Sequence, residues 1–181
     1  HGVPVSDEWY GPTGAFRGSE TCDVAGYIWS QICLLFVSGE GRMGDRAERA
    51  FFNAGPVTVS RDFKTHVYFQ SPNRFANMSP DFPHGPRAGG GTYQRKHSPL
   101  CCTAALNRIV PWYVTHMWMA TYDNGLAATC YGPCKVTALA ANFNTLNVVK
   151  RGGEVRSAEV QTPLTPLARR FGQQLGVGKH R

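Results

Sequence analysis

Residues 18–22 read Gly-Ser-Glu-Thr-Cys and open directly into an apolar stretch that ends at Gly39. Apolar side chains recur there at intervals of three and four positions, at Val24, Ile28, Ile32 and Leu35-Phe36. This is the period of an α-helix, and glycine is typical of a helix end. Further apolar residues fill the other faces, at Trp29, Leu34 and Val37. The stretch therefore predicts a helix that is buried nearly all round.

Outward from this helix the pattern predicts a mainly α fold with a few short strands. A second helix over 42–53, with Ala47, Ala50 and Phe51 turned inward, would complete an αα-hairpin. Residues 57–59 and 66–69 are strand-like, around a turn at Arg61-Asp62. A third helix is expected from about 100 to 122, and Pro111 should kink or break it.

The remaining segments are irregular or short. Residues 71–99 are rich in Pro, Gly and Ser, and a loop of that length is unusual unless it is functional. Asp123-Asn124-Gly125 predicts a turn, followed by strands over 126–131 and 135–139. Val148-Val149 can end a strand, but the apolar periodicity fades past residue 141, and residues 150–181 are expected to be poorly ordered.

Composition disfavours several classes of protein. The net charge is +7, but the segment from Lys150 onward carries seven basic and two acidic residues, so the body is close to neutral. A basic tail alone is weak support for nucleic-acid binding, and we expect none. No signal peptide and no run of about eighteen apolar residues is apparent, so we expect no membrane association. Six cysteines, two of them adjacent, favour reduced thiols and a cytoplasmic protein over a disulfide framework.

Two groups of thiols lie at predicted helix starts. Cys22 follows Glu20, and Cys101-Cys102 follow Pro99. The partial positive charge of a helix N-terminus favours thiolates, and thiolates with one carboxylate satisfy tetrahedral Zn²⁺. The spacing is not that of a zinc finger, so spacing alone leaves open the ordinary alternative, in which these cysteines are buried apolar residues.

Other polar residues have weaker patterns. Cys33 lies mid-helix and is expected in the core, and Cys130 and Cys134 flank a Gly-Pro turn, where a structural role is favoured. Tyr68 shares one side of an extended segment with its neighbours two positions away, which gives a pocket wall or a solvated sheet face. The histidines have no motif, so we expect structural roles for His66, His84, His97 and His116.

Taken together, these motifs resemble the non-reducing-end β-L-arabinofuranosidases of glycoside hydrolase family 127 and their relatives. The resemblance uses Gly-Ser-Glu-Thr-Cys at 18–22, Glu-Arg-Ala-Phe-Phe-Asn at 48–53, Tyr68 before Pro72-Asn73, Cys101-Cys102, and Asp123-Asn124-Gly125-Leu126. It covers about residues 1–140. Its order and spacing make the combination specific, although Glu-Thr-Cys alone is common.

The resemblance implies part of an (α/α)6-barrel catalytic domain over 1–140, and a basic, poorly patterned tail over 141–181 where the family has a β-sandwich. It also implies a Zn²⁺ ion held by a glutamate and three cysteines, which map to Glu20, Cys22, Cys101 and Cys102. Cys101 would be the nucleophile. Glu8 would be the acid/base, although Asp7 beside it stays open. Tyr68 and His1 would contact the sugar.

The resemblance thus implies a retaining hydrolase that releases β-L-arabinofuranose-like residues from plant-type glycans. Helices that the family places before residue 1 have no counterpart here, so we expect a partial chain with little or no activity alone. Uncovered apolar faces would favour self-association. Two alternatives remain: a non-catalytic zinc- or carbohydrate-binding helical module, and a redox-active thiol protein.

Overall fold

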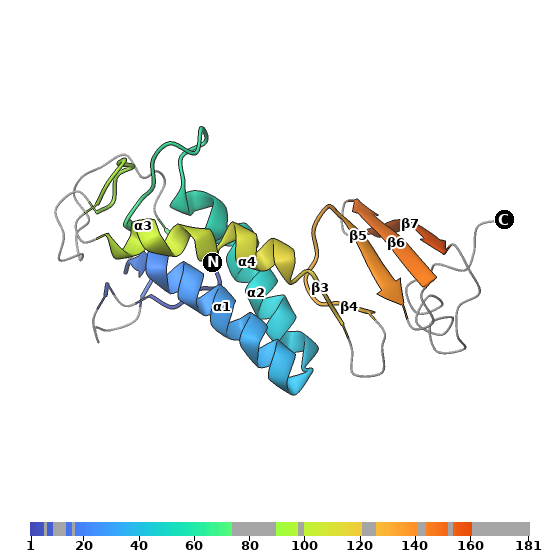
Figure 1. Ribbon diagram of the computed structural model, residues 1–181. Helices are drawn as coiled ribbons and strands as arrows, with labels where there is room; N and C mark the ends of the chain where they lie inside the picture. Colours follow the sequence, from blue (N-terminus) through green and yellow to red (C-terminus); the bar gives the residue numbers. More distant parts are fainter. Residues whose placement is uncertain are drawn as a thin grey trace. The chain divides into compact units, whose positions relative to one another are not determined.

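The chain forms two compact units, His1–Thr115 and His116–Arg181, which are described separately. The structure, a computed structural model, describes the backbone of residues 1–5, 7–8, 14–15, 17–73, 90–97, 100–120, 126–140, 144–151 and 154–160, with side chains up to residue 133. The turn predicted at Asp123-Asn124-Gly125 and most of the 71–99 segment lie outside these residues. Figure 1 shows the elements of both units.

Helix α1 (Thr21–Ser38) forms as predicted. Its first turn is closed by a capping box, in which the Glu20 side chain accepts from the Asp23 amide and the Asp23 side chain accepts from the Glu20 amide. Gly39 ends the helix in the left-handed conformation, at φ 68°, and its N–H donates to the Leu35 carbonyl. One face is buried in the unit, at Val24, Ala25, Ile28, Ile32 and Leu35.

The expectation that α1 is buried nearly all round is wrong for the described part of the chain. Trp29 is 44% exposed, Leu34 48% and Val37 84%, because α2, α3 and α4 pack on one side of α1 only. By length and composition alone α1 is apolar enough to cross a bilayer, contrary to the absence of such a run expected from the sequence. The core helix of a soluble protein shares that property. Self-association through the exposed face stays a prediction.

Helix α2 (Gly41–Asn53) lies beside α1 and completes the predicted αα-hairpin (Figure 1). Ala47 and Ala50 are fully buried, as expected, since small side chains let the two helices approach. After α2 the structure departs from the prediction. The strand expected at 57–59 is wrong for Val57 and Thr58, which lie in the 3-10 helix η1 (Gly55–Thr58) because Pro56 fixes a helical φ in its first turn. Val59 is extended and forms an isolated antiparallel bridge with His66.

Two short strands connect the beginning of α1 to the middle of the unit. Strand β1 (Ser19–Glu20) pairs antiparallel with β2 (Phe69–Gln70), so the strand predicted at 66–69 is shorter and later. Thr21 adds two bonds to the same segment: its amide donates to the Tyr68 carbonyl, and its hydroxyl donates to the Val67 carbonyl at 2.6 Å. The start of α1 is therefore fixed against β2.

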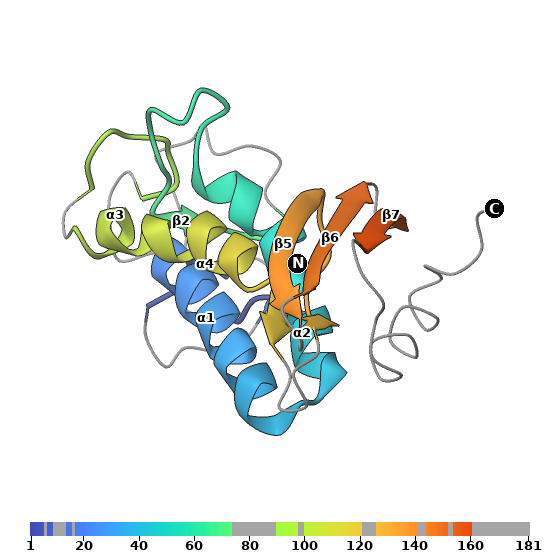
Figure 2. The same cartoon turned by 45° about the vertical axis from the view of Figure 1, so that its right-hand side comes forward.

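The predicted third helix is broken, as Pro111 indicated. Helix α3 (Cys101–Ala105), the 3-10 helix η2 (Leu106–Arg108) and helix α4 (Val110–Thr115) follow one another above α1 in Figure 2. The expected continuation to residue 122 is wrong, because strand β3 (Trp118–Ala120) pairs there with β4 (Leu126–Ala128). Backbone pairing with β4 outweighs the local helical pattern.

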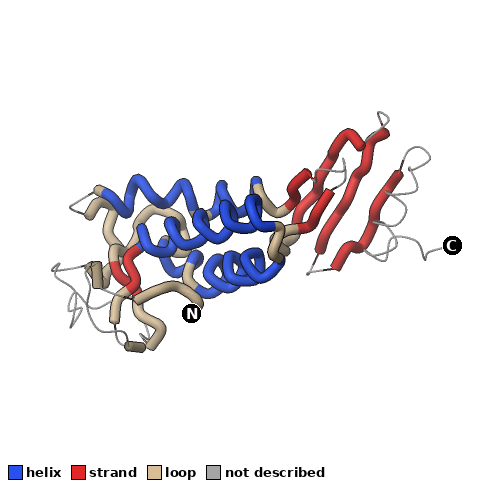
Figure 3. Tube along the Cα trace, turned by 90° about the horizontal axis from the view of Figure 1, so that it is seen from below, coloured by secondary structure: helices blue, strands red, loops and turns tan. Residues whose placement is uncertain are grey.

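Among its described residues the second unit contains a three-stranded antiparallel sheet, whose strands lie side by side in Figure 3. Its strands are β5 (Cys134–Ala140), β6 (Asn144–Arg151) and β7 (Glu154–Val160). The last two lie where a poorly patterned tail was expected, because β6 pairs with β5 and β7 pairs with β6, which supplies hydrogen bonds that the local sequence does not reveal. The division of the chain at residue 140 stays a prediction.

Aromatic packing joins α2 to α4, and its removal should destabilise the first unit. The Tyr113 ring stacks on Phe51 at 3.8 Å and meets Phe52 edge-on, and Tyr113 is fully buried. Tyr113→Ala should lower the free energy of unfolding by about 3–5 kcal/mol, as large-to-small aromatic changes do. Urea denaturation followed by circular dichroism measures this. The half-exposed neighbour Val114, changed to Ala, should cost less than about 1 kcal/mol, and equal losses would contradict the account.

Candidate metal and nucleophile site

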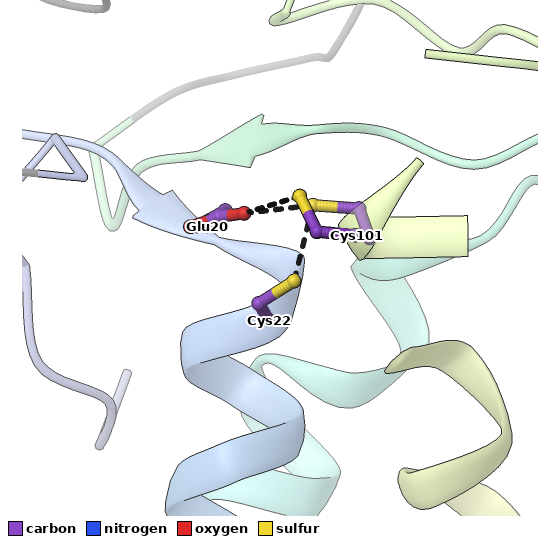
Figure 4. A group of neighbouring side chains, drawn as sticks. Glu20, Cys22 and Cys101 are labelled. Carbon is purple, nitrogen blue, oxygen red and sulfur yellow. Dashed lines mark hydrogen bonds between the residues drawn. The ribbon is translucent and has the colours of Figure 1, made fainter. Parts of the chain in front are cut away.

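Four side chains of the kinds that bind metal ions, from residues 20–22 and 101–102, lie close together in the first unit. The carboxylate of Glu20 and the sulfurs of Cys22, Cys101 and Cys102 provide one ligand atom each, and these atoms all lie within 4.8 Å of one another. Oε1 of Glu20 accepts from both thiols of the α3 pair, at 3.2 Å each, and the Cys22 and Cys102 sulfurs are 3.7 Å apart. Figure 4 shows Glu20, Cys22 and Cys101 converging from the starts of α1 and α3.

Local structure explains how residues so close in sequence reach one point. Glu20 ends β1 and Cys22 lies in the first turn of α1, where the backbone changes from extended to helical. Cys101 and Cys102 likewise occupy the first turn of α3. Cys102 is fully buried against Tyr68 and Phe69, while Cys101 is exposed. Adjacent cysteines on a helix point about 100° apart, which separates a buried sulfur from an accessible one.

The donor set fits a tetrahedral zinc ion. Zn–S bonds of about 2.3 Å place two tetrahedral sulfur ligands about 3.7–3.8 Å apart, and the Cys22–Cys102 distance is 3.7 Å. The sulfur-to-carboxylate distances of 3.2 Å need to lengthen by only a few tenths of an ångström. Three thiols with one carboxylate are zinc ligands rather than ligands of Mg²⁺ or Ca²⁺.

Electrostatics at the cluster also favours a cation. Loss of water around the sulfur raises the pKa of Cys101, the contact with Tyr68 lowers it, and Glu20 and Cys22 raise it further. The hydrogen bond with Cys22 and burial raise the pKa of Cys102. Crowded acids without a positive charge hold their protons, whereas a metal ion removes them.

Tyr68 connects the exposed thiol to a carboxylate. Its phenol donates to Glu8 Oε1 at 2.9 Å and lies 3.4 Å from the Cys101 sulfur. Burial, together with the bonds to Cys101 and Glu8, raises the pKa of Tyr68, so the phenol stays protonated. Glu8, Tyr68 and Cys101 thus lie in one row of contacting polar groups, which starts at the Cys101 sulfur of the four-ligand cluster.

The structure separates the two acidic residues of the opening loop. Asp7 is fully buried, forms a 2.8 Å ion pair with Arg17 and accepts from the Gly18 amide. Glu8 is exposed and reaches Tyr68. Both have left-handed backbone, with φ of 52° and 66°, which costs energy for residues other than glycine and which the Asp7 contacts hold in place. Of the two, Glu8 is the one that contacts Tyr68, and its role as the acid/base stays a prediction.

Sequence reasoning missed the support behind this row. His66 and His97 are buried and their rings meet edge-on at 4.8 Å. Nε2 of His66 lies 3.1 Å from the hydroxyl of Thr103 on α3, and Nε2 of His97 donates to the His66 carbonyl at 2.9 Å. Only the shared side of His66 and Tyr68 in the extended segment pointed here; nothing in the sequence indicated Thr103.

The remaining predicted residues lie elsewhere or stay unassigned. Among the described residues, no contact joins His1 to the cluster, and the next residue, Gly2, lies against Arg49 of α2. The part of His1 in sugar binding stays a prediction. Cys33 is half-buried rather than in the core, since it lies toward the uncovered side of α1, and Cys130 is fully buried, as a structural role requires.

Comparison with known proteins places this fold. No protein family model matches the chain, and neither does any curated protein sequence. Among solved structures it is similar to a GH127 β-L-arabinofuranosidase from Geobacillus stearothermophilus T6, with 16% identity and a TM-score of 0.64. It is also similar to a structure described as a glycoside hydrolase, with 18% identity and the same TM-score. Each alignment covers 82% of this chain and 24% of the other.

These similarities confirm the predicted fold. The chain is mainly helical, and its solved neighbours include a GH127 β-L-arabinofuranosidase, consistent with part of an (α/α)6-barrel domain. The chain spans about a quarter of the length of those structures. At this identity the comparison establishes the fold, and the activity is a separate question.

The buried His66 should make stability depend on pH. Burial and the neighbouring His97 lower the pKa of His66 below its ordinary value of 6.5, so the folded chain binds fewer protons than the unfolded chain below that pH. Its contribution to stability is fully present above pH 6.5 and falls as the pH drops toward the folded pKa. His66→Gln should flatten this decline in urea titrations between pH 7 and pH 5. His116→Gln is the control; if all three proteins show one slope, the assignment fails.

Proposed function

We propose that the chain carries the nucleophile and metal site of a retaining glycoside hydrolase that acts on β-L-arabinofuranose-like residues. The fold similarity supports the hydrolase class, because the solved neighbours are glycoside hydrolases by description. The cluster of Glu20, Cys22, Cys101 and Cys102 supports the metal site. The resemblance of the sequence motifs supports the residue roles.

The observation that carries the proposal is the row from Cys101 through Tyr68 to Glu8. The thiol and the carboxylate contact the same phenol oxygen, at 3.4 and 2.9 Å, so their separation cannot exceed the sum of these distances. Retaining enzymes keep their two reacting groups about 5–5.5 Å apart, whereas inverting enzymes leave a gap of about 6.5–9.5 Å for water. The short spacing favours double displacement with Cys101 as nucleophile.

A zinc ion on Glu20, Cys22, Cys101 and Cys102 would keep the thiols deprotonated at neutral pH. The protein residues then divide the work. Cys102 and Cys22 lie against the core and orient the cluster, whereas Cys101 is accessible to a sugar. Tyr68 stays protonated and donates to Glu8, which holds that carboxylate facing the nucleophile.

The reaction then takes two displacements at the anomeric carbon. In the first, the Cys101 sulfur forms a bond to carbon, the glycosidic C–O bond breaks, and Glu8 protonates the departing oxygen. In the second, Glu8 accepts a proton from water, the water oxygen bonds to carbon, and the electron pair of the S–C bond returns to sulfur. Two inversions retain the configuration.

Covalent labelling tests the nucleophile without requiring turnover, which we expect to be low for this chain alone. The probe is a carbocycle shaped as β-L-arabinofuranose with an epoxide at the anomeric position, which a thiolate opens and keeps. Peptide mass spectrometry should find one adduct, on Cys101. Cys101→Ser should remove it, since an alcohol without a strong base is a poor nucleophile. Cys33→Ser is the matched control and should label like the parent.

The outcomes separate the functions. Adduct on Cys101 that exceeds labelling by the D-configured epoxide supports a glycosidase. Equal labelling of several cysteines by both epoxides shows only thiol reactivity. Bound zinc with no adduct favours the alternative, a non-catalytic zinc- or carbohydrate-binding module.

The role of Glu8 predicts a dependence on the leaving group. Glu8→Gln removes the proton donor, so hydrolysis of an alkyl β-L-arabinofuranoside should slow by about 10²–10⁴-fold. A nitrophenyl glycoside, whose leaving group needs no proton, should slow far less. Single-turnover product analysis with excess chain gives both rates. Parent-like rates on both substrates would exclude Glu8 as the acid/base.

A further inference from the structure

Two contacts join the extended segment 66–68 to α3, and they are two residues apart in both segments. Tyr68 lies 3.4 Å from the sulfur of Cys101, and His66, two residues earlier, lies 3.1 Å from the hydroxyl of Thr103, two residues later. The mechanism uses the first contact. The second involves no reacting or metal-binding atom, so its part is structural or positional.

His66 is held in place by its burial and by several contacts. Its side chain is 3% exposed, and its backbone exchanges two 2.9 Å hydrogen bonds with Gln94. Its carbonyl accepts from His97, and the two rings meet edge-on. Because both the backbone of His66 and its ring are held by neighbours, the ring can fix the position of a group that it contacts.

Helix α3 depends on contacts outside itself for its position. It has five residues, and helices this short are not stable by themselves. The residue before it, Leu100, gives no side-chain cap and is 51% exposed. Its placement therefore depends on contacts to the rest of the unit, and the ligands Cys101 and Cys102 lie in its first turn.

We propose that His66, acting through the Thr103 hydroxyl, is a positioning residue that holds the first turn of α3 so that Cys101 and Cys102 face Glu20 and Cys22. The inference rests on the proposed function, since it assigns a support to that metal site. Without this contact the first turn of α3 can move. Metal binding must then order α3, and the free energy of that ordering lowers the affinity for the ion. Loss of such supporting contacts lowers metal affinity about 10–100-fold.

Thr103 is the exposed member of the His66–Thr103 pair, so substitutions there test the contact without disturbing the core. Thr103→Val keeps the shape of the side chain and removes the hydroxyl, and Thr103→Ser keeps the hydroxyl. His66→Gln tests the other half. Thr115→Val on α4 is the matched control, because it removes a hydroxyl that bonds to the Pro111 and Trp112 carbonyls of its own helix.

The measurement is the zinc dissociation constant, from competition with a chromophoric chelator, beside the rate of Cys101 alkylation by iodoacetamide in the reduced, metal-free chain. Thr103→Val and His66→Gln should weaken zinc binding about 10–100-fold and change the alkylation rate. Thr103→Ser and Thr115→Val should match the parent, and Thr103→Val should keep the parent's circular dichroism.

The opposite results overturn the inference. If Thr103→Val binds zinc within twofold of the parent, the contact does not position the ligands, while the metal site itself stands. If Thr103→Ser falls as far as Thr103→Val, the hydroxyl is not the cause. A folded parent that binds no zinc overturns the proposed metal site and this inference together.

Discussion

The carboxylate of Glu20 is the group on which the rest of the site depends. It closes the capping box of α1, and its Oε1 accepts from both thiols of α3, which lies about eighty residues later in the sequence. Pairing of β1 with β2 sets its position, and β2 begins beside Tyr68. One residue thus connects the helix start, the small sheet and the cysteine pair.

This arrangement places two adjacent cysteines in different surroundings. Cys102 is buried in the cluster with Tyr68 and Phe69, where a thiolate is unfavourable without a cation. Cys101 shares the carboxylate but is exposed, and its sulfur lies 3.4 Å from the Tyr68 hydroxyl. Purely structural zinc sites are closed on all sides and do not need an accessible ligand. An accessible residue among the four possible ligands is therefore a difference from such sites.

Much of this was predictable from local sequence. The 3.6-residue period predicted α1 and α2, and Pro111 predicted the break before α4. Thiols at helix starts left the metal site open, and the family resemblance implied the four donors that the structure brings together. What failed depended on distant partners: the exposed faces of α1, the pairing of β3 with β4, and the strands past residue 141. The resemblance favoured Glu8 but left Asp7 open, and the ion pair of Asp7 with Arg17 separates their surroundings.

Elemental analysis of the purified, reduced chain beside Cys22→Ala tests the central claim most directly, namely that Glu20, Cys22, Cys101 and Cys102 form one metal site. The account predicts about one zinc per parent chain and its loss, or a strong reduction, in Cys22→Ala. No zinc in a folded parent, or equal zinc in both proteins, would contradict it.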